Sequence, residues 1–146
     1  MPRTHGKLGE REFAEAIARV ARSHGRGVRV GIGDDAAVVD GWSGSAILST
    51  DTMVEGVHFK RAWLSPRALG RRAVRVATSD LAAMGARPRY LLLSLELSGP
   101  ASSAQPLAIV RAAMAEAEKE VVNIYVMGEA SAPGAKAVLP GTTFLQ

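Results

Sequence analysis

Apolar residues recur at spacings of three and four in three segments of the chain, and this period predicts three amphipathic helices. The segments are residues 10–23, 66–84 and 103–120. The second segment begins with Ser65 and Pro66, a pair that is typical of a helix start because Ser caps the first free N–H groups and Pro fits the first helical position.

Between the predicted helices lie short runs that predict strands. Tyr90–Leu97 is almost entirely apolar and is expected to be a buried strand. Other strands are predicted at residues 28–32, 36–39, 46–49, 52–59 and 121–127. In this interpretation Asp51 lies at the break between two strands, and His58 lies on an apolar strand, where a lone His is more often structural. Strands that alternate with helices predict an α/β or α+β domain.

Composition narrows the class of protein. The chain has 146 residues, no Cys, 47% hydrophobic residues and 22% charged residues, which suits one globular domain. Without Cys there is no disulfide framework, Cys-ligated zinc site or thiol nucleophile. No stretch reaches the roughly 20 apolar residues of a membrane span, and no secretory signal is expected. We therefore expect a cytoplasmic protein that has no membrane partner.

Acidic and basic residues are unevenly distributed. Residues 30–59 hold five Asp or Glu and no Lys or Arg, whereas residues 60–89 hold eight Lys or Arg and the single acid Asp80. Such neighbouring blocks suit a divalent cation beside a phosphorylated compound. The basic block could also bind nucleic acid, but aromatic residues are only 5% of the chain and lack the interleaving of RNA-binding proteins. Nucleic acid is therefore not an expected partner.

Three acidic elements carry the candidate chemistry. They are residues 31–35 (GIGDD), residues 49–52 (STDT), and Asp80, which is expected to share the apolar helix face of Val76 and Met84. Each has an ordinary structural explanation when taken alone: a turn, a polar strand end, or an ion pair. Together, and without a Cys, a His pair or a Ser/His/Asp set, they favour oxygen-only Mg²⁺ coordination of a polyphosphate. The predicted chemistry is phosphoryl transfer by metal clamping, with no covalent catalytic residue.

Three motifs, in this order and spacing, resemble those of the thiamine-monophosphate kinase family of the AIR synthase-like superfamily. They are GIGDDAA from Gly31, STDTMVEGVHF from Ser49, and SDLAAMGARP from Ser79. The resemblance covers about residues 8–97 well and 98–129 loosely. It implies an α+β fold of the AIR synthase-like amino-terminal type, a mixed β-sheet with helices packed on one face.

The resemblance also implies an activity and a set of site residues. The family transfers the γ-phosphoryl group of ATP to thiamine monophosphate in the presence of Mg²⁺, giving thiamine diphosphate and ADP, and it forms homodimers through its sheets. The implied substrate-binding residue is His58. The implied metal ligands are Asp35, Ser49, Thr50, Asp51 and Asp80.

The chain departs from the family pattern at three points. Ala77 stands where the family usually has Asn. In the family's later GGDTTRG element, the implied nucleotide-binding position, only Gly128 matches, and Glu129 replaces Asp. The family's carboxy-terminal domain is missing, so we expect an ATP- and Mg-binding domain at residues 1–129 and an atypical tail at residues 130–146. An inactive Mg-nucleotide-binding and dimerisation module is therefore the alternative to an active kinase.

Overall fold

A computed structural model describes most of the chain. The described residues are 10–20, 27–32, 36–41, 43–97, 104–120, 123–130 and 138–145. Only the backbone is described for the last two ranges and for residues 10, 11, 14, 97 and 120. None of the described helices is both long and apolar enough to span a membrane.

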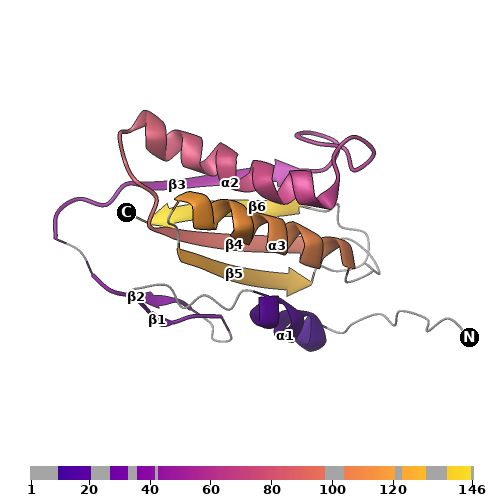
Figure 1. Cartoon of the computed structure of the whole chain (residues 1–146), viewed down its shortest axis with the longest axis horizontal. Helices are drawn as coiled ribbons and strands as arrows, with labels where there is room; N and C mark the ends of the chain where they lie inside the picture. Colours follow the sequence, from indigo (N-terminus) through magenta and orange to yellow (C-terminus); the bar gives the residue numbers. More distant parts are fainter. Residues whose placement is uncertain are drawn as a thin grey trace, which may run out of the picture.

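A four-stranded sheet forms the centre of the domain (Figure 1). Its order is β3 (Leu48–Val54), β6 (Val138–Leu145), β4 (Tyr90–Leu97) and β5 (Asn123–Ala130). β4 and β5 run parallel, while β6 is antiparallel to both β3 and β4. The mixed sheet expected from the resemblance is therefore confirmed.

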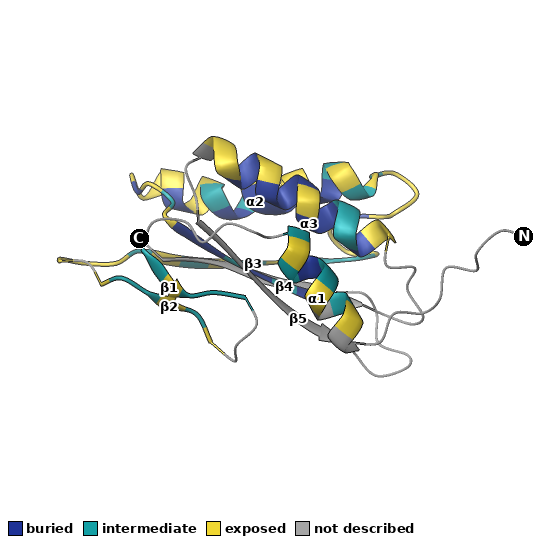
Figure 2. Ribbon diagram, turned by 60° about the horizontal axis from the view of Figure 1, so that its bottom comes forward, coloured by how far each residue is buried: buried dark blue, intermediate teal, exposed yellow. Residues whose placement is uncertain are grey.

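Two helices cover one face of this sheet, α2 (Pro66–Ala83) and α3 (Ala104–Ala117), and a 3₁₀ turn over Glu118–Glu120 extends the second. Figure 2 shows that their buried sides face the sheet. α1 (Glu10–Val20) contacts α3 and β5. The predicted layering, with helices on one face of the sheet, is confirmed.

A short antiparallel pair lies apart from the main sheet (Figure 1). It consists of β1 (Val28–Val30) and β2 (Val38–Val39), with Val28 opposite Val39. Both predicted strands exist here but are shorter than the apolar runs that suggested them. The loop between them carries the GIGDD element, of which residues 33–35 lie outside the described part of the chain.

Alternation along β4 builds the core. Leu91, Leu93 and Leu95 are at most 1% exposed, whereas Leu92 and Ser94 on the opposite face are half-buried. The leucines belong to one apolar cluster with the inward residues of the two covering helices, among them Val74, Ala77, Leu81, Val110 and Ala113. Burial of each Leu or Val side chain stabilises the folded state by roughly 1.5–3 kcal/mol. This apolar layer therefore holds the helices on the sheet.

The buried stripe of α2 differs from the predicted one. It passes through Ala73, Ala77 and Leu81, while Met84 is 67% exposed and Asp80 is exposed. The prediction that Asp80 shares a core-facing stripe is wrong. With 3.6 residues per turn, the residue that follows Ala77 on the buried side is Leu81, and Asp80 therefore lies at the margin of that side. The predicted helix start is confirmed, since Ser65 Oγ accepts the N–H of Ala68 at 3.2 Å.

The strand carrying the STDT motif is continuous. Asp51 lies inside β3 with a register shift after it, and not at a break between two strands. The prediction of a strand through residue 59 is also wrong, because Gly56 takes a positive φ of 85° and the chain turns over residues 56–58. His58 therefore lies in a turn.

The segment expected to be an atypical tail supplies β6, which pairs with β3 through Thr143 and Thr50 and with β4 through Thr143 and Leu92. Neighbouring strands supply hydrogen-bond partners on both sides, so the backbone can form a strand where side-chain periodicity is weak.

One buried carboxylate joins the two covering helices. Glu116 of α3 is 3% exposed and accepts hydrogen bonds from Arg75 Nε of α2 at 2.5 Å and from Lys119 Nζ at 2.8 Å. These two bonds lower the pKa of Glu116, so the carboxylate stays charged where it is buried.

Gly70 sets how closely α2 and α3 approach. A Cβ atom at Gly70 would lie 2.2 Å from the carbonyl oxygen of Ile109 and 3.0 Å from Ala112 Cβ. The first contact is with backbone, which cannot rotate away. Any side chain at residue 70 therefore forces the helices apart.

We expect Gly70→Ala to lower the free energy of unfolding by about 1–3 kcal/mol, because overpacking outweighs the better helix propensity of Ala. Urea denaturation measures this change. Gly41→Ala is the matched control, because a Cβ there would meet no atom within 4 Å. Equal stability of the two variants would contradict the close helix contact.

Candidate functional site

A strand and a helix bring together three of the predicted metal ligands. Ser49 and Asp51 lie on the face of β3 that is covered by α2, because side chains two residues apart share a face of a strand. Ser49 Oγ donates a hydrogen bond to Asp80 Oδ2 of α2 at 3.0 Å. Residues 31 positions apart along the chain therefore meet at one edge of the sheet.

Asp51 is the unusual member of this group. Its Oδ2 atom is buried and has no hydrogen-bond partner among the described residues. Burial raises the pKa of Asp51, the negative charge of Asp80 raises it further, and His58 partly opposes the shift. A carboxylate that is desolvated beside another carboxylate and lacks a donor is in an unfavourable environment unless a cation joins it.

His58 is held by the turn that follows β3. The backbone N–H of Val54 donates to His58 Nδ1 at 2.9 Å, so Nδ1 carries no proton and the proton of the neutral ring is on Nε2. The turn is closed by a bond from the Gly56 N–H to the Phe59 carbonyl at 2.7 Å, and Phe59 is buried. The exposed imidazole therefore carries its N–H donor on Nε2, and it lies close enough to Asp51 to influence the pKa of that carboxyl.

Two residues that the sequence analysis did not single out stabilise the same turn. Arg61 Nε lies 2.8 Å from the Glu55 carboxylate, and the Arg61 backbone N–H also donates to it at 3.4 Å. The side-chain bond is the main reason that the pKa of Glu55 is lowered. Opposite charges six residues apart, on either side of a Gly turn, were the available signal in the sequence.

Among the described residues, the other predicted site residues are not brought to this group. Thr50 points to the opposite face of β3, where it is exposed. Gly128 and Glu129 are on β5, whose backbone pairs with β4 at Leu95 and Glu96. Two strands separate β5 from β3, a distance of about 14 Å. Asp35 lies outside the described residues.

The group satisfies the requirements of Mg²⁺ better than those of a transition metal. Within the described part of the chain, no three His, Asp or Glu side chains are close enough to hold a metal by themselves. Mg²⁺ is commonly bound by one or two carboxylates, and water and substrate phosphates complete its octahedron. Asp51 and Asp80, with the Ser49 hydroxyl, provide such an incomplete oxygen set, and the unpartnered Asp51 Oδ2 is the atom that a cation would satisfy.

Comparison with known families identifies the domain. The family model described as AIR synthase related protein, N-terminal domain, matches residues 33–145. The chain belongs to this family. The match runs to residue 145 and so includes the residues of β6.

Similar proteins refine the assignment. A thiamine-monophosphate kinase of Bacillus subtilis (strain 168) is 40% identical over 105 residues, covering 71% of this chain and 31% of the relative. The crystal structure of thiamine-monophosphate kinase from Stenotrophomonas maltophilia K279a is 28% identical, with a TM-score of 0.69 over 90% of this chain and 40% of that one. The resemblance to this kinase family is thereby confirmed, and the chain spans about a third of the length of the curated relative.

One similar structure contains ligands. AaThiL complexed with AMPPCP and TMP is 29% identical to this chain, with a TM-score of 0.59. The superposition covers 99% of this chain and 43% of that one. The AIR synthase related domain described here is thus similar to part of a protein that binds a nucleotide analogue and TMP.

We expect Asp51→Asn to raise the melting temperature of the metal-free chain at pH 7 by about 3 °C. The pKa of Asp51 is raised by folding, so its ionised form destabilises the fold, and stability falls as the pH rises through that pKa. The neutral amide removes this pH dependence. Thermal unfolding between pH 4 and pH 8 measures it.

The same variant should lose the stabilisation that added Mg²⁺ confers on the parent chain, because a ligand that binds the folded state raises its stability. Glu118→Gln is the matched control, since Glu118 is an exposed acid of the 3₁₀ turn after α3. An unchanged Mg²⁺ response in Asp51→Asn would contradict the assigned site.

Proposed function

We propose that this chain is the metal- and nucleotide-binding part of a thiamine-monophosphate kinase, which transfers the γ-phosphoryl group of ATP to thiamine monophosphate with Mg²⁺ and gives thiamine diphosphate. The observation that carries the proposal is the buried, unpartnered Asp51 Oδ2 beside Asp80. A site that lacks a positive charge in this way is suited to Mg²⁺ that is bound to phosphates.

Each residue of the site has a distinct part in this proposal. Asp51 and Asp80 would hold Mg²⁺, which would supply positive charge that neutralises the phosphates. The hydrogen bond from Ser49 fixes one oxygen of Asp80 and so orients the other. His58 offers its Nε2–H to the phosphate of thiamine monophosphate from a turn that the Val54 N–H holds in place. Positioning and charge neutralisation supply the rate enhancement, with no covalent intermediate.

The alternative is a domain that binds Mg-nucleotide without turnover. The chain spans only 31% of the Bacillus subtilis relative, and Gly128 and Glu129 lie across the sheet from Asp51. Both versions require Mg-dependent nucleotide binding, and they differ in whether product forms.

The experiment is incubation of the chain with ATP, Mg²⁺ and thiamine monophosphate, with thiamine diphosphate quantified by chromatography. We expect Asp80→Asn to lower kcat/KM by at least about 100-fold, because it removes a charge from the metal clamp and keeps an acceptor for Ser49. Glu118→Gln, which changes an exposed acid of the 3₁₀ turn after α3, should leave the rate unchanged.

Calorimetry with Mg²⁺ and a non-hydrolysable ATP analogue separates the two versions. Binding without product would select the inactive module. Absence of any Mg-dependent nucleotide binding would contradict both.

A homodimer through the sheet is part of the same proposal. The helices α2 and α3 cover one face, and the other face presents Leu48, which is 58% exposed, beside the exposed Thr50 and Thr52. A sheet face of this kind is suited to packing on its copy, since two sheets stack about 10 Å apart with their side chains interdigitated.

We expect the chain to sediment as a dimer and Leu48→Asp to sediment as a folded monomer, because a charge would be buried in the interface. Analytical ultracentrifugation with circular dichroism measures mass and folding together. Met84→Asp is the control, since Met84 is at least as exposed as Leu48 but lies at the end of α2, on the covered side. A monomeric parent chain would contradict this part of the proposal.

A further inference from the structure

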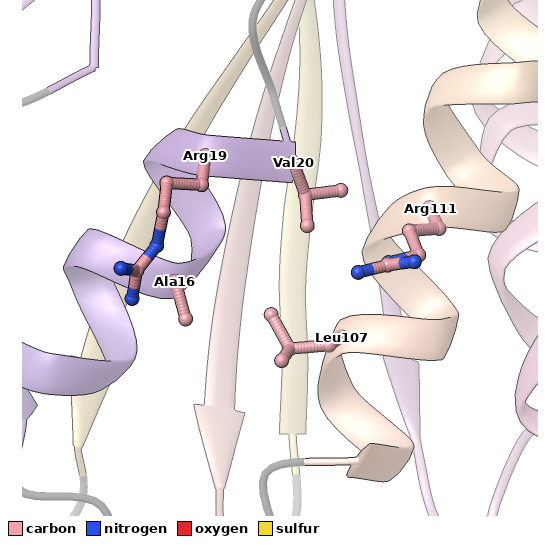
Figure 3. A pocket seen from close by; sticks show the side chains of 5 residues that line it. All are labelled: Ala16, Arg19, Val20, Leu107 and Arg111. Atoms are coloured by element: carbon pink, nitrogen blue, oxygen red, sulfur yellow. The ribbon is translucent and has the colours of Figure 1, made fainter.

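A pocket lies between α1 and α3, apart from the Asp51 site. Its lining consists of Ala16, Arg19 and Val20 of α1 and Leu107 and Arg111 of α3 (Figure 3). Its volume is about 460 Å³. Small-molecule sites have volumes of roughly 300–1,000 Å³, so the pocket has room for a small organic ligand.

The lining combines an apolar floor with two cations. Val20 and Leu107 pack against the hydrophobic core, and Figure 3 shows their side chains and that of Ala16 between the two arginines. Arg111 is the single basic residue of α3, a helix that is otherwise mostly buried. The two guanidinium groups therefore come from different helices and flank one apolar surface.

No carboxylate of the described residues neutralises these arginines. Neither Arg19 nor Arg111 has an ion pair or hydrogen bond within the part of the chain that the structure describes. Glu116, the acid of α3, is bound by Arg75 and Lys119. The other described acids of α1, Glu12 and Glu15, have interactions of their own. The positive charge of Arg19 is stabilised by the helix dipole, because Arg19 lies in the last turn of α1. Arg111 lies in the middle of α3, where the dipole offers no such stabilisation.

We propose that this pocket binds a small phosphate monoester whose organic part is apolar. Two guanidinium groups from different directions can each donate to a different oxygen of a phosphate dianion, and charge-assisted bonds of this kind are strong. The apolar body of the ligand lies on Ala16, Val20 and Leu107. The bound anion joins α1 to α3, since it replaces repulsion between the two cations by attraction of both to one group.

The test is NMR titration of the full chain at low salt with phenyl phosphate, which has one phosphate and one apolar ring. Inorganic phosphate, benzoate and benzyl alcohol are the comparison probes. We expect saturable binding of phenyl phosphate, with a Kd roughly tenfold lower than for inorganic phosphate or benzoate, because only phenyl phosphate offers three oxygens and buried apolar surface. Hydrogen exchange of the α1 amides should slow when it binds.

Three variants locate the site. Arg19→Gln and Arg111→Gln should each weaken phenyl phosphate binding by about tenfold, since each loses one charge-assisted bond. Ala16→Glu should abolish binding, because its carboxylate would occupy the two arginines from within the pocket. Arg71→Gln is the matched control, as Arg71 is an exposed arginine of α2 outside the lining. Melting temperatures close to that of the parent chain show that each variant is folded.

Several results would overturn the proposal. These are absence of saturable binding, equal loss of affinity in Arg71→Gln, and binding that survives in both pocket arginine variants. Stronger binding of benzoate than of phenyl phosphate would assign the pocket to carboxylates instead. Self-association of the chain that depends on Arg19 and Arg111 would assign it to a second copy. None of these measurements uses the kinase reaction, so they are independent of the proposed function.

Discussion

The packing of α2 across β3 is the constraint on which the candidate site depends. The buried stripe that ends at Leu81 fixes the rotation of the helix about its axis, and Gly70 lets the helix approach α3 at backbone contact. Because the rotation of α2 and its distance from α3 are fixed in this way, Asp80 lies just outside the core, within hydrogen-bond reach of Ser49. A helix rotated by one residue position, about 100°, would turn this carboxylate into the core or away from the strand.

The same packing creates an electrostatic cost. Asp51 lies beneath the edge of α2, where burial and the charge of Asp80 both disfavour its ionised form. Elsewhere the domain pairs its buried charge well, because Glu116 has two cationic partners. Glu116 is thus a carboxylate that holds two helices together, whereas Asp51 has no cationic partner among the described residues. Unpaired buried carboxylates are typical of sites whose partner is a ligand.

The order of the strands explains why the predicted nucleotide-binding residues of β5 lie far from the proposed metal ligand on β3. β3 is at one edge and β5 at the other, with β6 and β4 between them. A nucleotide contact at Gly128 or Glu129 and a metal contact at Asp51 are therefore separated by the width of the sheet.

Local patterns in the sequence determined the elements and the chemical types of the site residues. Helix periods predicted the ends of α2 to within one residue and those of α3 to within three, because an amphipathic stripe, and for α2 a Ser-Pro start, depend only on residues close together in the sequence. Motif spacing predicted the family and singled out Asp51, Asp80, Ser49 and His58. The tertiary structure decided what depends on distant partners. β6 forms because two strands supply its hydrogen bonds, and Thr50 points away from Asp80 because strand alternation is set by which face α2 covers. The unpartnered oxygen of Asp51 likewise arises only where a strand, a helix and a turn meet.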